Sequence, residues 1–336
     1  MADSLLYKLR SGKPSKLWFF IKGYAKMLIP HVYTVLRKSD ILQKAKERND
    51  CEYIWERVEY YNKLNEDVAL PTGTIRQNNY THYIFLDDVK EFRPSTFHKA
   101  YFFDIRDVVR YFPNKLRMGY IPGDVYFTPQ FPAIVKSRLL AANNGNSVLL
   151  KLDKLRHFMF VNDPIPFEEK KPQAIFRGKI RKSRLRRQFM EMYFGSDICD
   201  CGVVGKNEGF PKEWLMPKKT IREHLEYKFI ITLEGNDVAS NLKWVMSSNS
   251  IAVMTRPTCE TWFMEGKLIP GFHYIEIKDD LSDLRQKLEY YSSHLAEAKA
   301  IIAHAHEYVS QFLDTKREKI ISLLVAEKYF KRTKQI

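Results

Sequence analysis

The sequence predicts an α/β fold with two domains and a long C-terminal helical segment. At 336 residues the chain is too long for one ordinary core and suits two domains of roughly 150 residues each. Short apolar runs alternate with helix-like segments in both halves, which is typical of α/β rather than all-β domains. A hydrophobic content of 45% is enough to bury two such cores.

The N-terminal region is expected to be helical. Residues 17–36 are rich in aromatic and aliphatic side chains, but Lys22, Lys26 and Pro30 interrupt them, so the segment falls short of the ~20 apolar residues that span a bilayer. The mixture of aromatics and lysines suits either a helix lying on an anionic membrane or a helix packed on the core. Residues 40–67 follow as a charged helix with an apolar stripe.

Five apolar runs mark the expected strands of the first domain. They are 82–88, which ends in two aspartates, 100–107, 131–138, 147–152 and 157–163. The turn signal Asn-Asn-Gly-Asn at 143–146 separates the third run from the fourth. These runs predict an α/β domain over 1–165.

The segment 163–173 is the strongest linker candidate, since it carries three prolines and a charge cluster. The alternation then restarts in a second domain over 166–310. Its elements are a strand at 173–178, a basic amphipathic helix from Ser183 to Phe194, and further segments at 226–235, 240–248, 250–257 and 273–278. From Leu281 to Tyr329 the pattern is nearly continuous helix, and 311–336 is expected to pack back on the first domain.

The net charge of +15 predicts an anionic partner, whether nucleic acid, a membrane surface, nucleotide phosphates or a phosphorylated glycan. Of the four cysteines, Cys199 and Cys201 form a C-x-C pair, which offers too few cysteines at the wrong spacing for a structural zinc site. They indicate reduced thiols of a cytosolic protein.

Two strand ends in the second half are the candidate anion site. The first strand ends at Arg177-Gly178 and is followed by Lys179; a guanidinium there can hold phosphate in bidentate fashion. Ser183 is expected to cap the next helix, whose basic residues form either an anion site or a solvated face. The strand at 226–233 ends in a polar loop that leads into a helix carrying Lys243. The candidate ligand-binding residues of this loop and helix are Glu234, Gly235, Asn236, Asp237, Ser240, Asn241 and Lys243.

Carboxylates elsewhere are candidates for holding a sugar or for acting as a general base. Glu260 and Glu265 flank an aromatic pair, which suits contact with ribose or sugar hydroxyls. Asp124, on a proline-rich loop, can take the proton of an acceptor hydroxyl. On spacing alone Asp124 is no better than Asp87 or Asp88, and Asp104 and Asp163 also compete. Lys136 and Arg138 are acceptor-side candidates.

Several classes of protein are excluded by missing motifs. The sequence has no Walker A loop, G-x-S-x-G elbow, HExxH or G-x-G-x-x-G after a strand. Asp87-Asp88 is not a D-x-D metal motif. The aromatics beside the basic helix fall at core positions, which argues against nucleic acid as the ligand.

The motifs resemble glycosyltransferase family 90, which includes bacterial lipopolysaccharide core-type enzymes, fungal capsule xylosyltransferases and animal protein O-glucosyltransferases. The matching stretches are GDVYFTPQFPAIVKSR, NSVLLKLDKLRHFMFVNDPIPFEEKK, AIFRG, YKFIITLEGNDVASNLKWVMSSNS and PGFHYIEIKDDLSDL, within 119–284. The bacterial branch is the most similar.

This resemblance implies a GT-B-like fold of two Rossmann-like domains with a cleft between them. It further implies a UDP-sugar donor, inversion at the anomeric carbon, and no metal or cofactor. Arg177 and Gly178 match the family element near the donor diphosphate, and Lys243 matches its basic helix residue. Asp124 matches the catalytic aspartate. Asn241 stands where relatives have a second arginine, so Arg177 and Lys243 are expected to hold more of the phosphate.

The expected function is therefore transfer of a sugar from a UDP-sugar to a glycan acceptor, lipopolysaccharide core or capsule, by a cytoplasmic enzyme. Peripheral association with the inner face of the inner membrane is expected, because a basic surface suits a phosphorylated core oligosaccharide there. The alternatives are a basic nucleic-acid- or membrane-binding protein and a glycan kinase.

Overall fold

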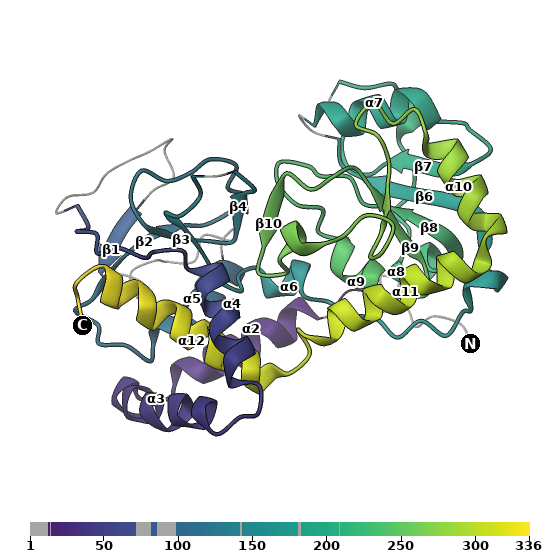
Figure 1. Ribbon diagram of the computed structural model, residues 1–336. Helices are drawn as coiled ribbons and strands as arrows, with labels where there is room; N and C mark the ends of the chain where they lie inside the picture. Colours follow the sequence, from purple (N-terminus) through teal and green to yellow (C-terminus); the bar gives the residue numbers. More distant parts are fainter. Residues whose placement is uncertain are drawn as a thin grey trace. The chain divides into compact units, whose positions relative to one another are not determined.

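The computed structural model describes residues 13, 15–71, 82–85, 99–141, 143–180, 183–207 and 209–336, with the backbone alone at 82–85 and 99. Its elements are labelled in Figure 1 and form two compact units. The N-terminal unit comprises Lys16–Leu155, Cys259–Met264 and Phe312–Ile336, and the C-terminal unit comprises Arg156–Thr258 and Glu265–Gln311. The chain passes from one unit to the other within α6 (Lys154–His157).

The N-terminal unit is built on a mixed sheet. Strand order is β1-β2-β3-β5, in which β2, β3 and β5 are parallel and β1 is an antiparallel edge. A separate antiparallel pair joins β4 to β10. The strands are β1 (His82–Phe85), β2 (Arg117–Ile121), β3 (Ala133–Val135), β4 (Ser137–Leu139), β5 (Ser147–Leu149) and β10 (Cys259–Thr261).

Helices cover this sheet, and the last helix of the chain is one of them. They are α2 (Lys16–Met27), α3 (His31–Lys46), α4 (Cys51–Tyr61), α5 (Lys99–Val109) and α12 (Thr315–Arg332). α12 packs against α3, α4 and α5. The hydroxyl of its Tyr329 accepts the Gly119 N–H at 2.8 Å and donates to the Pro132 carbonyl at 3.0 Å, which fixes the helix beside β2 and β3.

The C-terminal unit contains a fully parallel sheet in the order β11-β9-β8-β6-β7. Its strands are β6 (Lys171–Gly178), β7 (Cys199–Val203), β8 (Tyr227–Ile231), β9 (Ile251–Met254) and β11 (Ile275–Glu276). Its helices are α7 (Arg184–Tyr193), α8 (Ile221–His224), α9 (Leu242–Met246), α10 (Leu284–Ser293) and α11 (Leu295–Ser310), with 3₁₀ turns η2 (Phe167–Glu169), η3 (Lys212–Trp214) and η4 (Glu265–Lys267).

Strands β7, β8 and β9 are buried along almost their whole length, and β6 is buried in its middle, as expected for a parallel sheet covered on both faces. Numbered in chain order within the unit, the strands lie 2-1-3-4-5, a doubly wound order. The α/β fold is confirmed, as are the expected strands over 173–178, 226–235 and 250–257 and the helix from Ser183 to Phe194. The hydroxyl of Ser183 accepts the Arg186 N–H, so the expected N-cap is present.

The expectation for 100–107 was wrong, because this run lies in helix α5. Residues 101–105 are all buried, and so are Val108 and Val109, so the helix is covered on more than one face. A short apolar run with continuous burial suggested a strand, because such a run does not distinguish a buried strand from a buried helix.

The run at 157–163 does not form a strand either. Side chains bond its backbone in place of a sheet ladder, since the Val161 N–H donates to the Ser247 hydroxyl at 2.9 Å. The neighbouring 163–173 segment is not an open linker. The buried Lys170 ammonium pairs with the buried Asp163 carboxylate at 2.8 Å, and β6 begins at Lys171.

The C-terminal helical stretch is broken into α10, α11 and α12. α10 ends and α11 begins at His294, whose ψ of 66° is not helical. A second break ends at Asp314, whose carboxylate caps α12 by accepting the N–H groups of Lys316 and Arg317.

Candidate active site

The carboxyl ends of β6 and β8 form the candidate ligand edge of the C-terminal sheet. β6 and β8 are neighbours, but the chain turns to opposite sides of the sheet after them, which makes this pair the topological switch point. Open α/β sheets bind ligands in the crevice outside such a point. β6 ends at Gly178 and is followed by the exposed Lys179, while β8 runs into the polar loop 232–241.

The loop 232–241 is held in one conformation by side chains around it. The Glu234 carboxylate accepts the Thr258 N–H at 3.1 Å and the Thr258 hydroxyl at 2.5 Å. The Asn241 amide donates to the Ile231 carbonyl at 3.2 Å. Within the loop, the Gly235 N–H donates to the Asp237 carbonyl at 2.9 Å. The loop after β8 is therefore preorganised.

Arg186 connects the ends of the two strands. Its guanidinium donates to the Leu233 carbonyl at 2.8 Å and the Glu234 carbonyl at 3.0 Å after β8, and to the Lys179 carbonyl at 2.9 Å after β6. A side chain at Gly235 would place its Cβ 3.1 Å from this guanidinium. The sequence presented Arg186 as one of several basic residues on an amphipathic helix, and nothing in that pattern distinguished it from Arg184 and Arg187.

Arg177 turns away from the strand end and back along the sheet. Its guanidinium, 4% exposed, pairs with the Asp200 carboxylate at 2.5 Å and donates to the Asp200 carbonyl at 2.8 Å. Desolvation would raise the pKa of Asp200, but the Tyr227 hydroxyl and the Arg177 guanidinium outweigh it and lower that pKa to about 2. Arg177 is therefore engaged in an ion pair within the sheet.

Lys243 is also engaged inside the unit. Its side chain is fully buried on α9, and its ammonium pairs with the buried Glu265 carboxylate. Of the other residues expected here, Ser240 is exposed, Asp237 is buried, and Asn236 belongs to the same loop. The residues at the strand ends are thus brought together, while the cations of Arg177 and Lys243 point into the unit.

Asp124 lies in the N-terminal unit, on the loop after β2. Gly123 before it has a φ of +102°, a conformation that favours glycine. The buried Lys136 ammonium holds the Asp124 carboxylate at 2.7 Å, and that carboxylate remains 30% exposed. Ser137 accepts the Val125 N–H at 3.1 Å. Two successive residues therefore fix the loop and leave the carboxylate accessible.

Arg138 and Glu260 form a buried ion pair in the same unit. Their side chains are 0% and 1% exposed, and the guanidinium lies 2.8 Å from the carboxylate. Glu260 also accepts the Tyr60 hydroxyl, and Arg138 donates to the Tyr60 carbonyl at 2.7 Å. Glu260, expected in the donor site, therefore belongs to the N-terminal unit and joins β10 to β4.

The other aspartates that the sequence offered as the general base differ from Asp124 in burial and in hydrogen-bond partners. Asp87 and Asp88 lie outside the described residues. Asp104 is fully buried and accepts the Lys154 N–H at 2.9 Å, and this burial raises its pKa to about 7. Asp163 pairs with Lys170, as described above.

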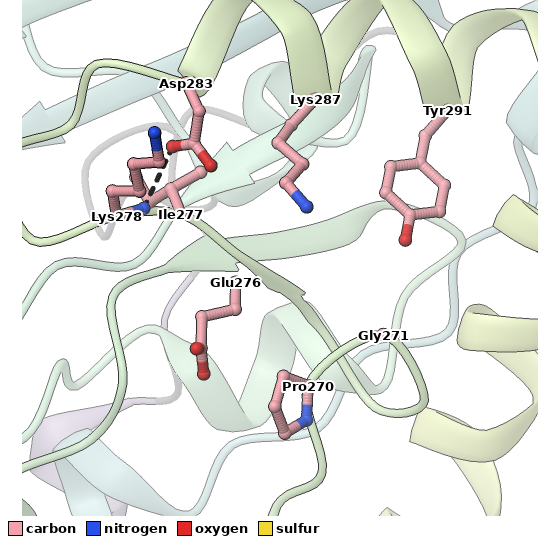
Figure 2. A pocket seen from close by; sticks show the side chains of 8 residues that line it. All are labelled: Pro270, Gly271, Glu276, Ile277, Lys278, Asp283, Lys287 and Tyr291. Atoms are coloured by element: carbon pink, nitrogen blue, oxygen red, sulfur yellow. Dashed lines mark hydrogen bonds between the residues drawn. The ribbon is translucent and has the colours of Figure 1, made fainter.

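A cavity of about 340 Å³ lies beside the edge strand β11. Figure 2 shows Asp283, Lys287 and Tyr291 along α10 on one side and Glu276 on the other, with the Lys278 N–H bonded to the Asp283 carboxylate at 2.9 Å. β9 separates this cavity from β8, so it does not lie at the switch point.

Among the residues that the structure describes, no three His, Cys, Asp or Glu side chains gather as the ligands of a metal ion would. In the same part of the chain, no helix combines the length and apolar character needed to span a bilayer.

A doubly wound parallel sheet with a polar loop at its switch point defines an α/β protein of the kind that binds ligands at this edge of the sheet. The model of glycosyl transferase family 90 matches residues 149–333, more than half of the chain. The chain belongs to this family and is a glycosyltransferase.

The relatives agree with this membership. The chain is 36% identical to the O-glucosyltransferase LpsA of Dichelobacter nodosus over 318 residues, covering 94% of this chain and 95% of the relative. Protein O-glucosyltransferase 3 of Rattus norvegicus is 26% identical over 168 residues, and that of Homo sapiens 25% over 167 residues. These two matches cover 48% of this chain and 32% of each relative.

Proposed function

We propose that this glycosyltransferase transfers a sugar from a UDP-sugar to a glycan acceptor, the lipopolysaccharide core or a capsular glycan, with inversion at the anomeric carbon. The preorganised switch point between β6 and β8 carries this proposal, because helix starts and polar loops at such a point suit a nucleotide diphosphate. The finer fold class, GT-B with Rossmann-like domains, is part of the proposal.

The donor would bind at Gly178, Lys179 and the loop 232–241. Lys179 supports this assignment because it is exposed directly beyond the end of β6, whereas Arg177 is engaged with Asp200. We assign Arg177, Lys243 and Arg186 a positioning role, since their cations bond protein groups around the strand ends. A lysine supplies a compact charge for a phosphate oxygen.

Asp124 would act as the general base. Its carboxylate takes the proton of the acceptor hydroxyl, the acceptor oxygen forms a bond to the anomeric carbon, and the bond from that carbon to the diphosphate oxygen breaks. UDP leaves with the electron pair, and attack from the opposite side inverts the configuration. The accessible carboxylate and its fixed loop support this role.

The acceptor assignment follows the resemblance to bacterial lipopolysaccharide enzymes, and the net charge of +15 suits a phosphorylated oligosaccharide. An acceptor of that kind is presented at a membrane surface, so the enzyme would work there as a peripheral protein. Lys136 and Arg138 would then serve the acceptor side by fixing Asp124 and the β4–β10 pair.

Thermal unfolding with UDP, GDP, CMP and ATP, each with and without EDTA, tests the donor class. We expect UDP to raise the Tm most and EDTA to leave that rise unchanged, because the proposal requires no metal. Failure of every uridine nucleotide to stabilise the protein, or selective stabilisation by ATP, would overturn the proposal.

A further inference from the structure

The hairpin of α2 and α3 carries an unusual concentration of exposed apolar side chains. Ten of the 22 large hydrophobic side chains that are exposed in the described part of the chain fall within twenty residues. The ten are Leu17, Trp18, Ile21, Tyr24, Met27, Leu28, Ile29, Val32, Tyr33 and Leu36. Contiguous exposed apolar surface of this kind marks a binding surface.

Helix α2 is apolar on two opposite faces. One face packs on the unit at Gly23, where an added Cβ would lie 2.5 Å from the Phe103 ring. The opposite face carries Leu17, Trp18 and Ile21, which are 70%, 57% and 45% exposed; Ile21 lies one turn beyond the adjacent Leu17 and Trp18. An ordinary surface helix has polar residues on its outer face.

The hairpin is firmly attached to the N-terminal unit, so its exposed face is a property of the folded protein. The Arg110 guanidinium donates to the Lys26 carbonyl at 2.7 Å and the Ile29 carbonyl at 3.1 Å, which caps the end of α2. On α3, the Thr34 hydroxyl donates to the Arg110 carbonyl at 2.6 Å. Beyond this anchor, α3 carries further exposed apolar side chains, Val32 and Leu36, each 69% exposed.

The charged residues of the segment itself are all basic, although Lys26 pairs with Asp107 at 2.7 Å and Lys38 with Glu327 at 3.1 Å. Residues 13–39 contain six lysines and arginines and no aspartate or glutamate. Lys22 lies over the Trp18 ring at 5.3 Å, and Arg37 over the Tyr33 ring at 5.5 Å. Among the described residues, neither these two cations nor Lys16 pairs with a carboxylate.

We propose that the exposed face of α2 and α3 docks on an anionic lipid bilayer. Its aromatic and aliphatic side chains would enter the boundary between headgroups and acyl chains, while Lys16, Lys22 and Arg37 contact anionic headgroups. A segment with ten exposed apolar side chains fits a lipid surface better than a phosphate backbone, for which cations dominate the contact. This inference stands on exposure and charge and does not depend on the donor or the acceptor.

Sedimentation of the full chain with phosphatidylcholine vesicles, with and without phosphatidylglycerol, tests the proposal in the absence of nucleotide. We expect binding to vesicles that contain phosphatidylglycerol and little binding to pure phosphatidylcholine. The triple variant Lys16→Glu, Lys22→Glu, Arg37→Glu should weaken binding by at least about a hundredfold, since each cation near an anionic surface is worth roughly fivefold.

The apolar half of the surface has its own variant, Leu17→Ser, Trp18→Ser, Ile21→Ser, which should also lose vesicle binding. Two controls match the chemistry elsewhere on the protein. Leu140→Ser, Ile269→Ser, Leu313→Ser removes exposed apolar side chains, and Lys212→Glu, Lys218→Glu, Arg222→Glu reverses exposed cations. Both controls should bind vesicles as the parent does, and all four variants should keep the parent Tm.

Three results would overturn the docking surface. The first is that the parent protein does not bind anionic vesicles, and the second is that the control variants lose as much vesicle binding as the hairpin variants. The third is that the hairpin variants keep vesicle binding and change only the oligomeric state or the binding of an oligonucleotide. The donor proposal is tested independently, because vesicle binding without a UDP-induced rise in Tm contradicts only the donor assignment.

Discussion

Asp124 in the N-terminal unit and Asp200 in the C-terminal unit are alike in two ways. Each carboxylate is about a quarter to a third exposed, and each pairs with a buried cation, Lys136 or Arg177. They differ in position, since Asp124 lies on a loop and Asp200 lies within strand β7. Asp200 also accepts the Tyr227 hydroxyl at 2.6 Å and pairs with Lys219 at 3.3 Å.

This difference in position distinguishes the carboxylate that we propose as the base from one that holds a sheet together. The bonds from Arg177 and Tyr227 keep the pKa of Asp200 near 2, so this group is a weak base. Exposure and ion pairing therefore do not identify the base. The loop position of Asp124 favours it for that role.

The largest expected effect comes from exchanging each of these two acids for its amide. Asp124→Asn should slow transfer by about 10²–10⁴-fold and leave the UDP-induced rise in Tm intact, because it removes the proposed base and no group of the donor site. The Tm without UDP should fall, because the buried Lys136 ammonium loses its charged partner. Asp200→Asn should instead lower the free energy of unfolding by roughly 2 kcal/mol, because Arg177 loses its charged partner. Initial rates per folded molecule and urea unfolding measure the two effects.

Unimpaired transfer by Asp124→Asn would remove this residue as the base and turn attention to Asp87 and Asp88. Loss of transfer in a fully folded Asp200→Asn would show that the two carboxylates are not distinguished by position.

The Lys243–Glu265 pair extends the comparison to an ion pair with both members buried. Lys243→Met should lower the free energy of unfolding by about 3–5 kcal/mol, because it leaves the Glu265 carboxylate buried without this cation. The double variant Lys243→Met, Glu265→Gln should recover much of that loss. Urea unfolding of the four proteins in this cycle measures the coupling, and additive losses would contradict it.

Asp104 adds a carboxyl with no exposure at all. Its pKa of about 7 lies above the unfolded value of 3.8, so the folded protein holds a proton that the unfolded chain releases. Stability is therefore expected to fall as pH rises from about 4 to about 7, by at most about 4 kcal/mol, and then to level off. Asp104→Asn should abolish this decline between about pH 5 and pH 8, whereas exposed Asp67→Asn should retain it. An unchanged decline in Asp104→Asn would assign it to another group.

The smallest effect is expected for Gly235→Ala, which tests the loop after β8. The new Cβ would press on the Arg186 guanidinium at 3.1 Å, and the loop would shift by a fraction of an ångström. We expect UDP affinity to weaken about tenfold with little change in Tm, since positioning errors cost binding more than folding. Gly145→Ala, with open space around its Cβ, is the control. Equal UDP affinity in both variants would separate this loop from the donor site.

The sequence predicted the C-terminal unit better than the N-terminal unit for a physical reason. Strands β6, β8 and β9 are buried on both faces, so each appears as a continuous apolar run between polar ends. In α5 the same kinds of residue are helical, and because residues 101–105 are all buried, neither their type nor their spacing reveals the helix. The strands of the C-terminal sheet were therefore predictable from their residue types, whereas helix α5 was not.

The roles of individual charged residues were less predictable, because they depend on where a side chain turns. Arg177 lies at the end of β6 and Lys243 lies on the helix after β8, as the sequence predicted. Both cations, however, point to carboxylates within the unit. Asp200 and Glu265 supply those partners from distant parts of the chain, and spacing along the sequence does not show such pairs. For the same reason, the sequence did not distinguish Arg186, which bonds both strand ends, from Arg184 and Arg187 on the same helix.

Backbone hydrogen exchange with and without UDP tests the donor site most directly. The account predicts that UDP slows exchange at Gly178, Lys179 and the loop 232–241, and leaves the cavity beside β11 unchanged. Protection confined to 270–278 and α10, with none at the ends of β6 and β8, would contradict it.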